Sequence, residues 1–137
     1  MSLKNWPSNP FYISLPVVLE IHKRQLEEFG GAEGIRNHSG LESALESPKG
    51  TFDGQDLYPT LFLKAAAYAY HLAESQSFID GNKRVALDTA LTFLAINGYE
   101  IEDEQFELYD AMIAIAEKKM SKENLAQLFE QLCKKHD

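Results

Sequence analysis

The sequence predicts an all-α protein, a single-domain helical bundle, from three observations. Apolar residues recur three and four positions apart in several long segments, which places them on one face of a helix. No segment alternates apolar and polar residues over a length that would make a strand. Proline and glycine stand where the helical segments would begin and end.

The first helix is expected over residues 14–29. Its apolar residues have helical spacing, and Pro16 suits the first turn, where an N–H group would have no partner inside the helix. Gly30-Gly31 ends the helix because glycine accepts left-handed backbone. Residues 1–13 are interrupted by proline and asparagine and are expected to form an irregular N-terminal arm.

A short second helix follows, with Ser39 and Glu42 spaced as a capping box at its start. Ser47-Pro48 ends it, because the residue before a proline avoids helical backbone. Residues 49–55 are turn formers and are expected to be a loop. A third helix is expected from residue 56 or 59 through residue 75, and its alanine, leucine and aromatic residues indicate a largely buried helix.

The helix over residues 81–97 is apolar on most sides, is expected at the centre of the bundle, and ends at Asn97-Gly98. Two amphipathic helices over residues 103–119 and 121–135 complete the chain, and their terminal lysines suit the negative end of the helix dipole. Residues 1–137 are therefore expected to fold as one domain around one core.

Charge and composition argue against several classes of protein. The net charge of −8 disfavours a general nucleic-acid or anionic-membrane surface, because phosphates attract basic faces. No apolar window is long enough to span a bilayer, and the N-terminus has no apolar segment of a signal peptide. The single Cys133 cannot form an internal disulfide. We therefore expect a cytoplasmic protein with no membrane partner and no direct nucleic-acid partner, in which any phosphate site is local.

Residues 78–84, Phe-Ile-Asp-Gly-Asn-Lys-Arg, stand where a loop enters a helix. A helix N-terminus carries unpaired N–H groups and about half a positive charge, so cations are disfavoured there. Lys83 and Arg84 nevertheless both lie in the first turn. An anion over the helix end would explain them, with Gly81 allowing close approach and Asn82 donating from its amide.

Asp80, immediately before the glycine, is the candidate metal ligand. Mg²⁺ is bound by one or two carboxylates together with phosphate oxygens and water, so Asp80 would hold a magnesium ion that also contacts the phosphates. A simpler interpretation makes Asp80 a helix cap, Asn82 a turn residue, and Lys83 with Arg84 a solvated pair. Many junctions between a loop and a helix fit this simpler interpretation. The residues around the segment are therefore needed to choose between a phosphate site and an ordinary helix start.

The segment over residues 78–84 resembles the motif His-x-Phe-x-Asp-(Gly/Ala)-Asn-Lys-Arg of the Fic/Doc family. It has the Doc form, since Lys83 occupies a position that is usually glycine in Fic adenylyltransferases. Other short stretches resemble Doc-like chains in the expected order: Ile21-His22, Phe29-Gly30-Gly31, Gly34-Ile35-Arg36, residues 41–45, Tyr58-Pro59-Thr60 and residues 93–99. The resemblance implies the small all-α Fic/Doc bundle, in which the motif loop joins two central helices.

The Doc resemblance implies a toxin of a toxin–antitoxin pair that phosphorylates a threonine of elongation factor Tu from ATP. The implied cofactors are ATP and Mg²⁺, with Asp80 as the metal ligand. The implied nucleotide-binding residues are Phe78, Gly81, Asn82, Lys83 and Arg84. The Fic branch would instead imply transfer of AMP to a protein hydroxyl, and Lys83 favours the Doc branch.

The motif histidine of the family is replaced by Gln76. In the family this histidine is taken to remove the proton from the attacking hydroxyl, and glutamine has no titratable nitrogen that could do so. The implied catalytic positions are therefore Gln76, Asp80, Lys83 and Arg84. Three explanations stay open: a naturally degenerate member, a substitution introduced or selected because the active protein is toxic, and a glutamine that only orients the target hydroxyl.

Two further histidines, His71 and His22, lie outside the motif. His71 lies five residues before Gln76 and would be a substitute base, but its apolar neighbours favour a packing role. His22 is expected to be structural. Without the histidine, a pseudoenzyme that binds nucleotide or antitoxin is the alternative to an enzyme. No serine or threonine precedes a glutamate by four residues, as in the inhibitory helix of many Fic proteins, so inhibition is expected to come from a separate antitoxin.

Overall fold

The computed structural model describes residues 9–134, and the all-α class predicted from the sequence is confirmed there. Residues 1–8 of the expected arm lie outside the described residues, and residues 9–14 form neither helix nor strand. In chain order the elements are α1 (Leu15–Phe29), α2 (His38–Glu46), the 3-10 helix η2 (Ser47–Lys49), β1 (Thr51–Phe52), β2 (Gln55–Asp56), α3 (Leu61–Ser75), α4 (Asn82–Ile96), β3 (Glu100–Ile101), α5 (Glu107–Ala116), α6 (Lys122–Leu132) and β4 (Cys133–Lys134).

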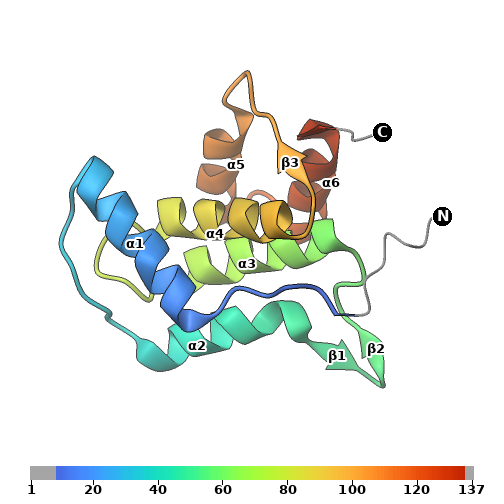
Figure 1. Ribbon diagram of the computed structural model, residues 1–137, viewed down its shortest axis with the longest axis horizontal. Helices are drawn as coiled ribbons and strands as arrows, with labels where there is room; N and C mark the ends of the chain where they lie inside the picture. The colour runs from blue at the N-terminus through green and yellow to red at the C-terminus, as the bar shows by residue number, and fades with distance from the viewer. Residues whose placement is uncertain (1–8, 135–137) are drawn as a thin grey trace.

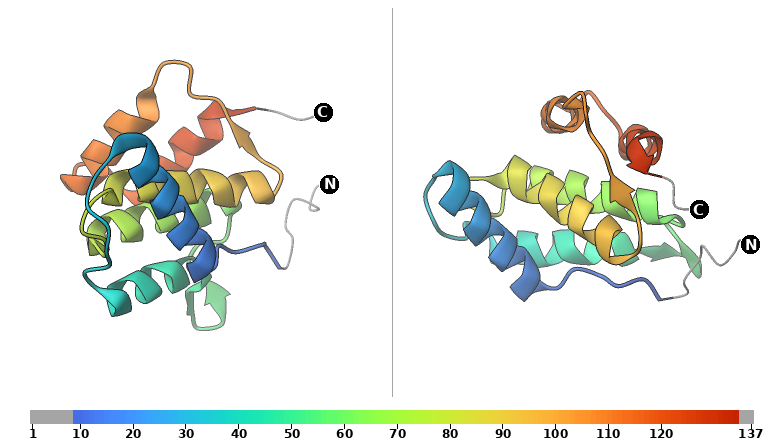
Figure 2. Two further views of the ribbon diagram at one scale, coloured as in Figure 1. Left: turned by 60° about the vertical axis from the view of Figure 1, so that its left-hand side comes forward. Right: turned by 45° about the horizontal axis from the view of Figure 1, so that its top comes forward.

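Helices α3 and α4 lie side by side at the centre of the molecule (Figure 1). Helix α2 covers one side of this pair, and α5 and α6 cover the opposite side (Figure 2). Helix α1 packs across α4 at the end where the motif loop lies. The prediction of a central α4 was incomplete, because α3 shares that position and contacts α2, α4, α5 and α6.

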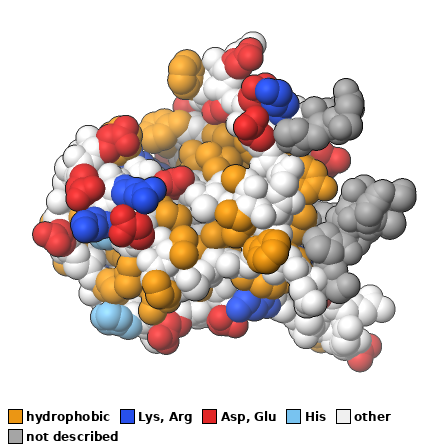
Figure 3. Space-filling view, in the orientation of Figure 1, with side chains coloured by type: hydrophobic (Ala, Val, Ile, Leu, Met, Phe, Trp, Pro, Cys, Tyr) orange, Lys and Arg blue, Asp and Glu red, His pale blue; other side chains and the backbone are white. Residues whose placement is uncertain are grey.

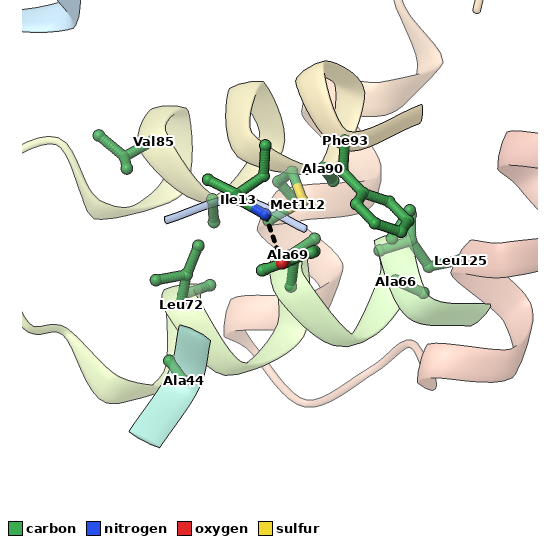
Figure 4. Packing of buried hydrophobic residues seen from close by; sticks show 14 of the residues in the cluster. Ile13, Ala44, Ala66, Ala69, Leu72, Val85, Ala90, Phe93, Met112 and Leu125 are labelled. Carbon is green, nitrogen blue, oxygen red and sulfur yellow. Dashed lines mark hydrogen bonds between the residues drawn. The ribbon is translucent and has the colours of Figure 1, made fainter. Parts of the chain in front are cut away.

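The core is a cluster of buried apolar side chains that surrounds α3. This helix contributes four fully buried alanines, Ala65, Ala66, Ala67 and Ala69. Phe93 of α4, Met112 of α5 and Leu125 of α6 gather beside them (Figure 4). Small side chains on α3 leave room for the larger ones of its neighbours, which is how the interior reaches close packing.

Helix α2 begins two residues earlier than a Ser39 cap would require, so that prediction was wrong. Asn37 is the cap: its Oδ1 accepts hydrogen bonds from the backbone N–H of Gly40 at 2.9 Å and from the Ser39 hydroxyl at 3.1 Å. Asn37 has extended backbone and stands three residues before the N–H that it binds, which is the usual cap geometry. His38 is therefore the first helical residue.

The expected loop over residues 49–55 contains a small antiparallel hairpin of β1 and β2, which the sequence analysis missed. Its turn residues, Asp53 and Gly54, have φ of 54° and 79°. Asp-Gly with positive φ at both positions is the favoured two-residue hairpin turn. Helix α3 begins only at Leu61, after Thr60, whose hydroxyl accepts from the Leu63 N–H at 3.0 Å.

Helices α5 and α6 are shorter than predicted. The Asp103 carboxylate accepts from the N–H groups of Glu107 and Leu108, at 2.7 and 2.9 Å, so it precedes α5 and caps it. Helix α5 ends before the lysines that were expected in its last turn. Helix α6 ends at Leu132 because the following residues form β4 and pair with β3.

Candidate functional site

The motif loop joins α3 to α4 and is bracketed by two residues with left-handed backbone. Gln76, with φ 45° and ψ 47°, ends α3, and Gly81, with φ 84° and ψ 15°, begins α4. Glycine adopts this backbone freely, whereas a residue with a side chain is destabilised there by about 1–2 kcal/mol. Gln76 is exposed, so its side chain is available to a partner or a target.

The loop is held in place by a second segment, residues 34–37, that pairs with it. Ile35 and Phe78 form an antiparallel bridge, and the Ile79 N–H donates to the Gly34 carbonyl at 3.1 Å. The Ser77 carbonyl accepts from the N–H groups of residues 36 and 37, at 2.6 and 3.1 Å. Gly34 has φ of 125°, a backbone conformation that favours glycine, and a Cβ there would lie 2.8 Å from Cδ1 of Ile79, which would have to shift. The sequence analysis did not foresee this pairing.

Asn82 connects the start of α4 to the same loop. Its Oδ1 accepts from the Phe78 N–H at 3.0 Å, and its Nδ2 donates to the Phe78 carbonyl at 2.9 Å. The predicted donation to a phosphate would therefore use the other hydrogen of the amide. In the structure itself Asn82 fixes the shape of the loop.

Asp80 does not cap α4, so the simpler interpretation of this residue was wrong. Its Oδ2 accepts from the Ala32 N–H at 2.7 Å, across 48 residues of sequence. Helix α4 has no side-chain cap and no acidic residue in its first turn. Within residues 9–134 no three His, Cys, Asp or Glu side chains gather closely enough to hold a metal ion. A magnesium ion at Asp80 would thus depend on further oxygens from a phosphate or from water.

The N-terminus of α4 offers several backbone N–H groups to a ligand. Gly81 is left-handed and is followed by a right-handed helix, the alternation that makes successive N–H groups converge into an anion-binding nest. The first N–H groups of an uncapped helix have no intrahelical partner and carry the positive end of the helix dipole. The backbone at this junction is therefore suited to a phosphate.

Two cations stand beside this helix end. Lys83 is exposed and forms no ion pair with any residue that the structure describes. The Arg84 guanidinium lies over the Phe29 ring, with Cζ 4.1 Å from the ring centroid, so it is held by α1 and is not simply solvated. Neither charge is paired with a carboxylate among residues 9–134, so both cations are available to an anion at the helix end.

Phe78, a predicted nucleotide-binding residue, lies in the core with 2% of its surface exposed. Its ring is stacked on His22 of α1, with centroids 3.9 Å apart and an interplanar angle of 16°. This burial supports the loop from beneath and leaves little of the ring to contact a nucleotide. Beside it lies a hollow of about 510 Å³, whose lining is mixed: it contains the apolar Leu19, Leu26 and Ile35 and the charged Lys23, Glu27 and Glu33.

His71 has the packing role that was favoured for it. Lys122 Nζ lies 3.2 Å from its Nε2 and 2.6 Å from the Tyr58 hydroxyl. Burial lowers the pKa of His71 below its usual 6.5, and the Lys122 charge lowers it further, while Glu74 opposes both effects. A ring nitrogen engaged by a lysine and a tyrosine is poorly suited to act as a base at the motif.

The remaining surface is mixed. Charged side chains of both signs gather at one end of the face shown in Figure 3. On α1 one such pair is Arg24 and Glu20, 3.2 Å apart, and both are largely exposed. None of the helices within residues 9–134 has the length and hydrophobicity needed to cross a membrane.

Comparisons with known proteins agree with this geometry. The model of the Fic/DOC family matches residues 12–94. Toxin Doc of Mycolicibacterium smegmatis is 44% identical over 73 residues, which are 53% of this chain and 56% of that protein. Protein kinase doc of Escherichia phage P1 is 27% identical over 121 residues, which are 88% of this chain and 94% of that protein. The chain thus matches only about half the length of the first of these relatives.

Proposed function

The chain belongs to the Fic/DOC family, and from this premise we propose that it is a Doc-like toxin built to transfer a phosphoryl group from ATP to a protein hydroxyl. Two relatives support the Doc branch by their names, Toxin Doc and Protein kinase doc. By the resemblance to Doc, the proposed acceptor is a threonine of elongation factor Tu. A cytoplasmic location follows from such a target.

The observation that carries the proposal is the uncapped, glycine-led N-terminus of α4 with two cations in its first turn. Unpaired N–H groups and the helix dipole favour an anion. Lys83 would add a mobile charge, and Arg84 would add a guanidinium held by Phe29. A structural junction would instead place a carboxylate here, since that is the stabilising choice at a helix start.

The residues present also fit magnesium bound together with nucleotide. Asp80 Oδ2 is occupied by the Ala32 N–H, while no hydrogen bond within residues 9–134 occupies Oδ1. One free carboxylate oxygen is too little for a magnesium site by itself, but it suffices beside phosphate oxygens and water. ATP would supply the phosphoryl group, and magnesium would neutralise charge on its oxygens.

Gln76 determines whether binding leads to turnover. Transfer needs the acceptor hydroxyl to lose its proton as its oxygen bonds to phosphorus, and glutamine can orient that hydroxyl but cannot take the proton. Losing a general base typically costs about 10²- to 10⁴-fold in rate. We therefore propose a chain that retains nucleotide binding and transfers slowly or not at all until the histidine is restored.

The test uses ATP labelled on either the α- or the γ-phosphate, incubated with elongation factor Tu and with the native chain or its Gln76→His variant. Label from the γ-position on the target, much stronger in the variant, is the expected result. Label from the α-position would mean that AMP is transferred, as in Fic proteins. No label from either position, with ATP still bound, would favour the alternative, a nucleotide-binding pseudoenzyme.

The exposed, left-handed Gln76 is the observation that favours that alternative. Neither His71 nor His22 supplies a free ring nitrogen to this turn, because His71 is bound to Lys122 and Tyr58 and His22 is bound to the Asp80 carbonyl. A binding protein needs no base at Gln76. Calorimetry with ATP and magnesium separates this alternative from a chain that has lost the site entirely.

We also propose an antitoxin as the partner, because one relative bears the name of a toxin. The net charge of −8 favours a basic or amphipathic antitoxin segment over an acidic one. The hollow beside Phe78, lined by apolar side chains and by Glu27 and Glu33, would accommodate side chains of such a segment next to the motif. Co-expression of the chain with the product of a small neighbouring reading frame tests this. A stable complex is expected, and the absence of any complex would count against the proposed partner.

A further inference from the structure

His22 is a buried polar residue that the proposed chemistry does not use. It lies on α1 with 7% of its surface exposed, and it contacts two residues of the motif loop. Its Nε2 is 3.0 Å from the backbone carbonyl oxygen of Asp80, across 58 residues of sequence. A carbonyl oxygen can only accept, so Nε2 carries the hydrogen and donates it.

This hydrogen bond controls the direction of the next N–H group. In a planar trans peptide the C=O and N–H groups point in opposite directions. Drawing the Asp80 carbonyl towards α1 therefore turns the Gly81 N–H away from α1. Gly81 is the first residue of the nest, so its N–H is the one that a change in this peptide would reorient.

The ring of His22 is itself held in place. It is stacked on Phe78 with centroids 3.9 Å apart, nearly parallel, so it cannot rotate without losing that contact. A Cβ on Gly81 would lie 3.8 Å from Cδ2 of the same ring, which places His22 directly against the glycine that opens α4. One side chain therefore supports the loop, the glycine and the peptide between them.

We propose that His22 is a positioning residue of the phosphate site, which acts by holding the peptide between Asp80 and Gly81 so that the Gly81 N–H joins the first N–H groups of α4 around one anion. The inference rests on the proposed function, since it concerns the same site. His22 does not touch the nucleotide. It acts through the backbone. Its effect therefore depends on how far the hydrogen-bond donor of residue 22 extends from the backbone of α1.

That dependence on reach allows a matched test with His22→Gln and His22→Asn. A glutamine Nε2 reaches the same place as the histidine Nε2, whereas an asparagine Nδ2 is one methylene shorter. Both variants lose the ring and with it the stack on Phe78, and His22→Asn also loses the hydrogen bond to the Asp80 carbonyl. A purely structural role predicts that the two variants differ in stability alone, while their folded forms bind ATP equally.

The positioning role predicts that they differ. In calorimetry with ATP and magnesium, His22→Asn should bind roughly three- to tenfold more weakly than His22→Gln, the effect of one lost hydrogen bond. Equal dissociation constants for the two variants, measured where both are folded, would overturn the inference. His22→Phe, which keeps a ring but no donor, should bind as weakly as His22→Asn.

A measurement without ligand separates this inference from the proposed function. Nitrogen-15 NMR of the native chain should show His22 as the Nε2–H tautomer with a slowly exchanging ring proton. The amide shift of Gly81 should differ between His22→Asn and His22→Gln, which both lack the ring and differ in the hydrogen bond to the Asp80 carbonyl. If the native chain binds no ATP, the proposed function fails, and the Gly81 shift still decides whether His22 orients that peptide. If ATP binds but the Gly81 shift is the same in all variants, only the inference about His22 fails.

Discussion

Replacing Asn82 by alanine removes both hydrogen bonds that join the first residue of α4 to the motif loop. The bonds run to the N–H and the C=O of Phe78, at 3.0 and 2.9 Å, and both are partly buried. No other group of residues 9–134 is hydrogen-bonded to these two Phe78 atoms, so the substitution leaves one donor and one acceptor unpaired. The loop that carries Asp80 and Gly81 would lose its connection to the helix.

The size of the effect follows from these two bonds. Each contributes a net of about 0.5–1.5 kcal/mol to the free energy of unfolding, so the pair contributes about 1–3 kcal/mol. Alanine has a higher helix propensity than asparagine by up to about 0.7 kcal/mol, which offsets part of the loss. We expect Asn82→Ala to be destabilised by about 1–2 kcal/mol.

The assay is urea unfolding followed by circular dichroism, with Asn124→Ala as the matched control. Asn124 also lies in the first turn of a helix, α6, but it is exposed and its side chain makes no hydrogen bond with residues 9–134. The control should change the unfolding midpoint by little or raise it slightly, with an unchanged slope. An Asn82→Ala protein as stable as this control would refute the role given to Asn82, and with it the account of how the loop is held.

Three further predictions concern the same region. The double variant Lys83→Ala with Arg84→Ala should lose at least tenfold in affinity for ATP and magnesium, measured by calorimetry, because each charge-assisted hydrogen bond contributes about 1.5–3 kcal/mol. An unchanged affinity would show that no phosphate lies at this helix end. Gln76→Gly should raise the free energy of unfolding by about 1 kcal/mol, because φ is 45° there and glycine removes the strain; a destabilised variant would contradict that backbone. The pKa of His71 is lowered in the folded chain by burial and by Lys122, so the folded state binds fewer protons than the unfolded state. The contribution of His71 to the free energy of unfolding is therefore fully present above pH 6.5 and decreases as the pH falls below it. A chain with His71→Gln should show a flatter pH dependence of its melting temperature.

The motif loop contains features that can be predicted from neighbouring residues and contacts that depend on residues remote in sequence. The cations at a helix start and the glycine before them are neighbours in sequence, so they were enough to predict a phosphate site. The partners that give the loop its shape are remote: Ala32 binds Asp80 across 48 residues, and His22 binds it across 58. No pattern within one segment reports such contacts, because they depend on how α1 packs against α4.

The sequence alone determined the helical class, the approximate places of α1, α3 and α4, and the position of the motif over residues 78–84 between two helices. These follow from apolar spacing and from end signals such as Gly30-Gly31, which act within one or two turns of a helix. It also carried a signal that was missed, since Asp53-Gly54 is the preferred turn of the hairpin that the structure contains.

Only the tertiary structure decided what the side chains of the motif do. Phe78 became a core residue because α1 brings His22 against it, and Asp80 lost its role as a cap because the segment after α1 supplies the Ala32 N–H. Which donor meets which acceptor is set by packing between elements that are distant in sequence. The kinds of residue at the proposed phosphate site were therefore readable from the chain, while their contacts required the fold.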